Sequence, residues 1–270
     1  MRRIAAATAA AGSLVIATAL FSASPAAAAD TAEVFVVHGI PGLTVDVYVD
    51  GKRALDDFAP ETTAGPLDLP AGSHAVAITA ADAADASDPV LAADADLTAG
   101  NSYSLVAHLS ADGAPTLTPY SNDISTVGAG QARLVVRHDA AAPAVDVRAG
   151  GAVVLSNVTN PNQGSLTVPA GTVNADVVLA GTSTVAIGPA NLDLAEGSAT
   201  FVHAVGSAAD GTLTLVSFVI PDLHSAPGGV PAGTGPVDDP ALVVAVAALL
   251  VAGVALFAVG SRRLVAHRSR

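Results

Sequence analysis

Short runs of alternating hydrophobic and polar residues dominate the middle of the chain. Residues 44–49, Thr-Val-Asp-Val-Tyr-Val, alternate strictly, so their three valines share one face of a β-strand. A continuous apolar run at residues 34–37, typical of a buried strand, and further strand-like runs at 74–79 and 103–108 are separated by turn signals rich in Gly, Pro and Asp. The 3.6-residue period of an amphipathic helix is missing from this region. The pattern predicts an all-β fold of short strands, typical of a β-sandwich.

The same series of residues occurs twice along the chain. His38 corresponds to His138, and the Val-Asp-Val around Asp46 to the Val-Asp-Val around Asp146, each pair 100 positions apart. Each copy has about 90 residues, a size at which a domain folds independently. We therefore expect two tandem β-sandwich domains, at residues 30–123 and 127–222.

Four motifs in these copies carry a family resemblance. They are Val-Val-His at residues 36–38, Val-Asp-Val-Tyr-Val-Asp-Gly at 45–51, Leu-Pro-Ala-Gly at 69–72 and Leu-Thr-Ala-Gly-Asn-Ser-Tyr at 97–103. Together they resemble the domain-of-unknown-function family 4397 (DUF4397), a bacterial extracellular family. The resemblance implies tandem immunoglobulin-like β-sandwich domains outside the cell, and it implies no activity. It is looser in the second copy, where Arg148 replaces Tyr48 and Thr200 replaces Tyr103.

The N-terminal segment differs from the middle of the chain. Arg2 and Arg3 precede an apolar stretch that ends in small residues, as in a secretory signal peptide at residues 1–29. Cleavage is expected between Ala29 and Asp30. An uncleaved N-terminal anchor is the alternative.

The C-terminal segment predicts an anchor. Residues 223–240 are rich in Pro, Gly and Asp, as in a flexible stalk, and residues 241–260 are uncharged and long enough to form one transmembrane helix. The arginines of residues 261–270 favour the cytoplasmic side. We expect a single-pass membrane protein with an extracellular N-terminal ectodomain at the cell surface.

This segment also resembles a cell-wall sorting signal of Gram-positive bacteria. Residues 231–235, Pro-Ala-Gly-Thr-Gly, match a Leu-Ala-any-Thr-Gly motif except that Pro231 replaces Leu. The resemblance implies sortase cleavage between Thr234 and Gly235 and linkage to peptidoglycan. A permanent membrane anchor is the alternative.

Composition narrows the classes of function. The chain has no Cys, so disulfide bonds are excluded and each domain needs its own core. Between residues 30 and 239, 24 acidic residues stand against five basic ones, a net charge of −19. This charge repels phosphate backbones and argues against nucleic-acid binding. The excess of acidic residues is explained either by a solvated surface or by cation binding.

His38 with Asp46, and His138 with Asp146, are the candidate site residues. Each pair has the residue types of a base and its orienting carboxylate. The simpler interpretation is structural, with the imidazole bonded to loop backbone and the carboxylate bonded to a turn or a neighbouring strand. No catalytic residue, metal site or cofactor is predicted, because nucleophile elbow, zinc spacing and phosphate cradle are all missing from the sequence.

The sequence therefore predicts a non-enzymatic structural or interaction protein of the cell surface. Its expected partners are the cell membrane, through the C-terminal helix, and peptidoglycan or other envelope proteins. The alternative is an extracellular binding protein for a small ligand or a cation. Its site would be the histidine pairs or the acidic loop from Asp82 to Asp96, whose oxygens suit calcium.

Overall fold

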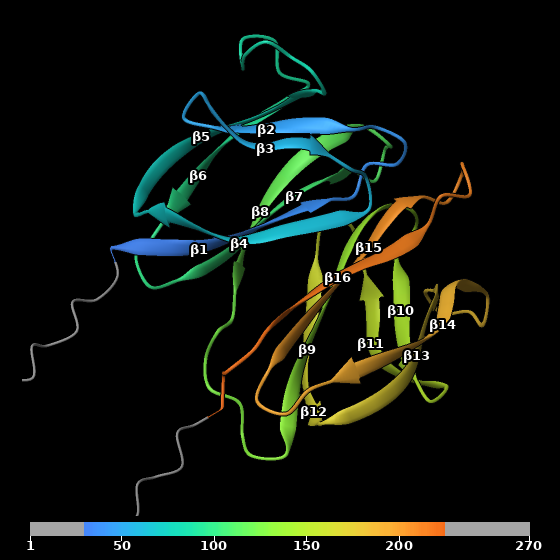
Figure 1. The fold of residues 1–270 in the computed structure, drawn as a ribbon. Helices are drawn as coiled ribbons and strands as arrows, with labels where there is room; N and C mark the ends of the chain where they lie inside the picture. The colour runs from blue at the N-terminus through green and yellow to red at the C-terminus, as the bar shows by residue number, and fades with distance from the viewer. Residues whose placement is uncertain (1–29, 225–270) are drawn as a thin grey trace, which may run out of the picture. The chain divides into compact units, whose positions relative to one another are not determined.

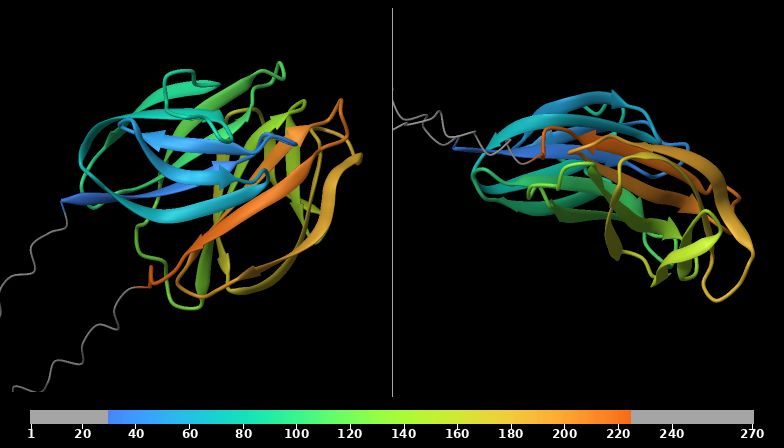
Figure 2. Two further views of the ribbon diagram at one scale, coloured as in Figure 1. Left: turned by 45° about the horizontal axis from the view of Figure 1, so that its top comes forward. Right: turned by 90° about the horizontal axis from the view of Figure 1, so that it is seen from below.

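The structure, a computed structural model, describes residues 30–224. These residues form 16 β-strands, and the ribbons contain no helix over this range (Figures 1 and 2). The predicted all-β class is confirmed for this part of the chain. The chain divides between Asn122 and Asp123 into two compact units, here called unit 1 and unit 2. The predicted signal segment and transmembrane helix lie outside the described residues, and so does the predicted stalk after its first two residues, Leu223 and His224. Those two residues are bonded to unit 2, because Val127 donates to the carbonyl oxygen of Leu223 and forms a β-bridge with His224.

Unit 1 consists of two four-stranded sheets, with strand orders β4-β1-β7-β8 and β3-β2-β5-β6. Strands β1 and β7 are parallel, and the other neighbours are antiparallel. The strands are β1 (Thr31–His38), β2 (Val45–Val49), β3 (Lys52–Phe58), β4 (Thr62–Pro70), β5 (Gly72–Ala80), β6 (Leu91–Leu97), β7 (Ser102–Leu109) and β8 (Pro115–Asn122).

Unit 2 has the same order of strands, in the sheets β12-β9-β15-β16 and β11-β10-β13-β14. Strands β9 and β15 are its parallel pair. The strands are β9 (Gln131–Ala141), β10 (Val145–Ala149), β11 (Ala152–Val158), β12 (Gln163–Pro169), β13 (Gly171–Leu179), β14 (Val185–Leu194), β15 (Ala199–Ser207) and β16 (Thr214–Ile220).

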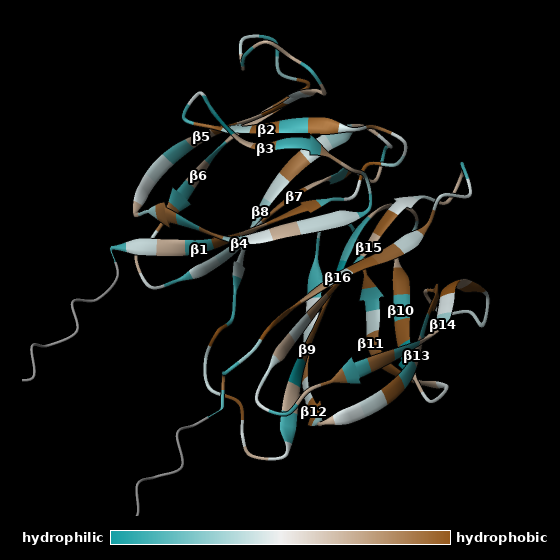
Figure 3. Cartoon of the chain, in the orientation of Figure 1, coloured by the Kyte–Doolittle hydropathy of each residue, from teal (hydrophilic) through white to brown (hydrophobic). Residues whose placement is uncertain are grey.

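The two sheets of unit 1 share one hydrophobic core. Val34 and Val36 of β1 pack in the same buried cluster as Val45 and Val47 of β2 and Ile78 of β5. Successive side chains of a strand point to opposite faces, so residues two positions apart reach the same face. Figure 3 shows hydrophobic (brown) and hydrophilic (teal) bands along the strands. Aliphatic residues supply nearly all of this core, as a chain with 3% aromatic residues requires.

The architecture is compatible with two β-sandwich domains, but the strand order differs from that of immunoglobulin domains. Immunoglobulin constant domains have seven strands, with the first, second, fifth and fourth in one sheet. Here each unit has eight strands, and the first strand lies beside the fourth and the seventh. The alternation of residues predicts two-sheet packing but does not specify which strands are neighbours.

Candidate functional site

The two candidate histidines hold the loops that follow their strands. His38 ends β1 with 1% of its surface exposed, and its Nε2 lies 2.6 Å from the carbonyl oxygen of Leu43. The carbonyl can only accept, so Nε2 donates and Nδ1 of the neutral ring carries no proton. Within the described chain, Nδ1 has no hydrogen-bond partner. Burial lowers the pKa of His38, opposed by the Leu43 hydrogen bond, so the ring is held neutral.

His138 makes the equivalent contact in unit 2. Its Nε2 lies 2.9 Å from the carbonyl oxygen of Pro143, and its Nδ1 is 3.4 Å from the backbone N–H of Ala140. The ring is also buried, with 1% of its surface exposed. Both imidazoles therefore tie a loop carbonyl to the end of a central strand.

The two candidate aspartates hold a neighbouring strand. Asp46 accepts a hydrogen bond from the backbone N–H of Asp57 at 2.9 Å, and Asp146 accepts one from Asn157 at 2.8 Å. Asp57 and Asn157 have φ values of 50° and 53°, in the left-handed region, close to register shifts in β3 and β11. The carboxylates thus satisfy backbone donors at two bulges.

The remaining carboxylate oxygens differ between the two units. The second oxygen of Asp146 accepts the N–H of Gly181 at 2.8 Å, and the Gly181 and Asn157 bonds together lower the pKa of Asp146. The second oxygen of Asp46 has no hydrogen-bond partner among the described residues and lies 3.5 Å from Nε of Arg53. In neither unit does the carboxylate orient the histidine, so the geometry favours the structural alternative over a base and its orienter.

The acidic loop between β5 and β6 forms hydrogen bonds within itself and with side chains of β2 and β3. Asp85 accepts the N–H of Ser87 at 2.9 Å, and the Ser87 side chain and N–H lower the pKa of Asp85. Tyr48 and Arg53 both donate to the carbonyl oxygen of Ala83, at 3.0 and 2.8 Å. No group of three metal-ligating side chains occurs in residues 30–224.

Two His–Asp pairs join residues that are distant in the sequence. His74 Nδ1 lies 2.7 Å from Asp50, and that hydrogen bond raises the pKa of His74. His203 Nδ1 lies 2.7 Å from Asp139, with both side chains fully buried. The sequence shows these histidines only as scattered residues, because the pairs form through strand pairing between positions 24 and 64 residues apart.

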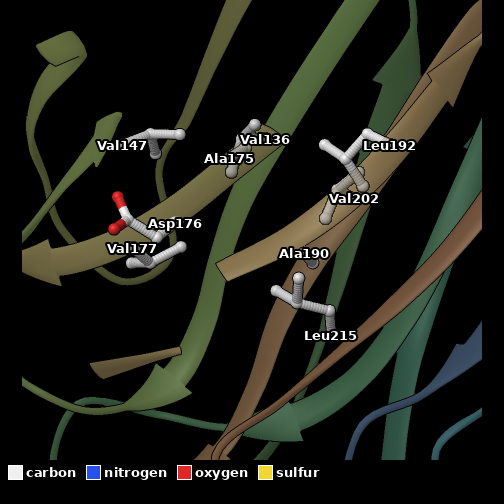
Figure 4. Close-up of a pocket in the computed structure, with 9 residues that line it drawn as sticks. All are labelled: Val136, Val147, Ala175, Asp176, Val177, Ala190, Leu192, Val202 and Leu215. Atoms are coloured by element: carbon white, nitrogen blue, oxygen red, sulfur yellow. The ribbon is translucent and has the colours of Figure 1, made fainter. Parts of the chain in front are cut away.

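The core of unit 2 contains a small cavity, shown in Figure 4. Its volume is about 20 Å³, room for one water molecule. Eight aliphatic residues and Asp176 line it, and Asp176 is paired with Arg148. The cavity is a gap in packing and not a ligand site.

Unit 1 has a larger groove between its edge strands β6 and β8, with a volume of about 270 Å³. Tyr103, Tyr120, Asp94 and Asp96 line it together with Pro119. Backbone N–H of Thr98 donates to the Tyr103 hydroxyl at 3.1 Å, which fixes that ring at the groove. Sequence reasoning missed this groove, because its residues meet only when the edges of two different sheets come together.

Several predicted features lie outside the described residues. Ala29 and the apolar segment before it precede them, and Asp30 is their first residue. The predicted anchor at residues 241–260 and the sortase positions Thr234 and Gly235 follow them. Within residues 30–224, no helix has the length and hydropathy needed to cross a membrane.

Comparison with known proteins gives one family match. No curated protein matches the chain. A family model described as "Domain of unknown function (DUF4397)" matches residues 32–148, which include most of β1, all of β2 to β9 and most of β10. The match supports the DUF4397 family for this part of the chain.

Proposed function

We propose that this protein is a non-enzymatic structural or interaction protein of the cell surface, which displays two β-sandwich domains. One observation carries the proposal. The polar residues with the strongest pattern in the sequence bond to backbone: His38 to Leu43 and His138 to Pro143, with Asp46 and Asp146 bonded to the adjacent strands. Side chains used in this way support a rigid framework that carries loops.

The setting follows from the ends of the sequence. The predicted signal peptide at residues 1–29 and the predicted transmembrane helix at 241–260 favour a single-pass protein with an extracellular ectodomain. Cleavage between Thr234 and Gly235 would instead link the domains to peptidoglycan. The partners we propose are the membrane, the wall or other envelope proteins.

Cell fractionation with mass spectrometry of both termini tests this setting. A chain that starts at Asp30 and ends at Arg270 in the membrane fraction supports the anchor. A chain that ends at Thr234 and is bound to peptidoglycan supports wall linkage. Recovery in the cytosol with Met1 retained contradicts both forms of the proposal.

A second candidate function is the binding of a small ligand, which the groove between β6 and β8 favours. Two tyrosines and two carboxylates at a groove of about 270 Å³ could hold a polar ligand or a cation. Thermal shift with calcium, zinc and soluble wall fragments tests it. A shift lost in Asp96→Asn and kept in Asp112→Asn, on an exposed turn, supports the groove. If no compound produces a shift, this second candidate is wrong.

A further inference from the structure

The two units differ in charge at one edge of their sandwiches. This edge is formed by β3 and β4 in unit 1 and by β11 and β12 in unit 2, the terminal strands of corresponding sheets. In unit 2 a Cβ at Gly164 would lie 2.6 Å from a methyl of Leu155, so β12 and β11 are in contact across the sandwich. Edge strands present backbone N–H and C=O groups that add further strands unless something blocks them.

In unit 1 this edge is blocked. The pairing of β4 with β1 shifts register around Gly65 and Pro66, and Pro66 has no N–H to donate. Asp68 adds a charge to the same strand. Four of the seven residues of β3 are also charged: Lys52, Arg53, Asp56 and Asp57. Bulges, prolines and charges are the features by which sheet proteins prevent pairing between edges.

In unit 2, β12 has no bulge and no charge, and its one proline, Pro169, is its last residue. The strand pairs with β9 in an unbroken register from Gln163 to Pro169. Thr167 lies opposite Arg133, in the place where Asp68 lies opposite Glu33. The sequences of β11 and β12, Ala-Val-Val-Leu-Ser-Asn-Val and Gln-Gly-Ser-Leu-Thr-Val-Pro, contain no charged residue.

The neighbouring strand β11 extends the uncharged surface, although it is bulged. Val153 is 53% exposed at the position where unit 1 has Arg53, as their equivalent pairings with Arg148 and Tyr48 show. Val154 beside it is 37% exposed. Exposed valines next to a regular edge strand favour contact with another protein over contact with water.

We propose that β12 is a strand-addition surface through which two copies of this chain associate, antiparallel, about a twofold axis at Leu166. The inference rests on the proposed role as an interaction protein and names its partner. Full overlap of two β12 strands places Ser165 of one copy opposite Thr167 of the other, a hydroxyl pair that stabilises antiparallel strands. The two Leu166 side chains then meet on the opposite face of the combined sheet.

The lack of charge on β12 allows a second copy to pair there in spite of the acidic surface of the chain. Residues 30–122 have two basic and 14 acidic residues, a net charge of −12, whereas residues 123–224 have three and eight, a net charge of −5. Two such acidic chains repel each other over most of their surfaces. When the β12 strands of two copies pair, no charged residue of either strand faces the other, because β12 contains none. A twofold dimer of this type closes on itself and does not form filaments.

Cysteine cross-linking of the full chain tests the pairing, because the natural sequence has no Cys. A mixture of Ser165→Cys and Thr167→Cys chains places the two sulfurs on directly opposite residues, within the Cα range of a disulfide. In either variant alone the cysteines are diagonal, about 7–8 Å apart, which exceeds that range. After mild oxidation we expect at least about tenfold more covalent dimer in the mixture. Equal yields, or no dimer at all, overturn the proposal.

Matched variants in unit 1 provide the control. A mixture of Pro66→Cys and Asp68→Cys chains occupies the corresponding positions of β4. Each variant removes one blocking residue and keeps the other together with the register shift, so we expect no covalent dimer from the mixture. Cross-linking there as strong as in unit 2 overturns the proposal, because it would report only random collisions.

A charge variant tests the affinity without cysteine. Light scattering of the full chain should show a concentration-dependent dimer. Thr167→Asp should raise its dissociation constant at least about tenfold, because it copies the charge of Asp68. Thr167→Ser keeps the strand uncharged and keeps the hydroxyl, so it should leave the dissociation constant within about twofold. Aspartate opposite Arg133 is compatible with the fold of unit 2, so loss of the dimer would not reflect unfolding.

The failure of this inference is distinguishable from the failure of the proposed function. A monomeric chain found at the cell surface refutes the dimer and leaves the interaction role in place. A dimer that is found in the cytosol refutes the setting and leaves the pairing of β12 in place.

Discussion

At the scale of single residues, the pH dependence of stability separates two histidines. Burial lowers the pKa of His38, so at mildly acidic pH the unfolded chain binds a proton that the folded chain does not. The contribution of His38 to stability is therefore complete above pH 6.5, the ordinary pKa, and is lost as the pH falls below it. We expect His38→Gln to flatten the decrease in unfolding free energy between about pH 7 and pH 5, measured by urea denaturation.

His74 provides a control for His38, because its pKa is shifted in the opposite direction. Its hydrogen bond to Asp50 raises its pKa, so its contribution is complete below pH 6.5 and is lost as the pH rises through the folded value. His74→Gln should therefore remove stability mainly at acidic pH. Identical pH profiles for the two variants would contradict the assignment of opposite shifts.

Asp46 tests whether the carboxylate acts as a backbone acceptor. It is fully buried and accepts the N–H of Asp57. Asp46→Ala should lower the free energy of unfolding by about 1–3 kcal/mol, because that donor loses its acceptor. Asp46→Asn keeps an oxygen that can accept the N–H of Asp57 and should lower the free energy of unfolding by less. Equal losses in the two variants would show that the charge matters and the hydrogen bond does not.

At the scale of elements, the turn after β15 depends on one glycine. Gly206 has a φ of +90°, and an added Cβ would lie 2.2 Å from the carbonyl oxygen of Thr212. Gly206 is the second-last residue of β15. Gly211, in the turn itself, has a φ of +67° with nothing within 4 Å of an added Cβ. Gly211→Ala should therefore cost only the strain of a left-handed residue, about 1 kcal/mol. Gly206→Ala should cost on the order of 3 kcal/mol or more, and similar urea midpoints for the two would contradict this.

The strands that sequence predicts best are the central ones. The runs at residues 44–49 and 74–79 correspond to β2 and β5, which lie inside their sheet. Strand β5 buries mainly one face, whereas β2 also buries polar residues such as Asp46 on its other face. The edge strand β3 gives no such signal, because its sequence is largely charged and a left-handed Asp57 interrupts it. Its strand conformation comes from pairing with β2, and local propensity does not reveal such pairing.

At the scale of the whole molecule, contacts between distant residues limit what sequence can predict. The roles of His38 and Asp46 are local, since their partners lie five and 11 residues away. The buried pair of Asp139 and His203 depends on β9 and β15 lying side by side in parallel. Hydrophobic periodicity fixes which face of a strand is buried and leaves its neighbours undetermined.

Net charge gives a prediction for the molecule as a whole. Residues 30–224 hold 22 acidic and five basic residues, so repulsion destabilises the compact state at low salt. Raising sodium chloride from about 10 to 150 mM shortens the Debye length from roughly 30 to 8 Å and should raise the melting temperature. Calcium chloride at equal ionic strength should give the same rise if the acidic surface is only solvated. A larger rise with calcium, abolished by Asp85→Ala, would instead support cation binding by the loop between β5 and β6.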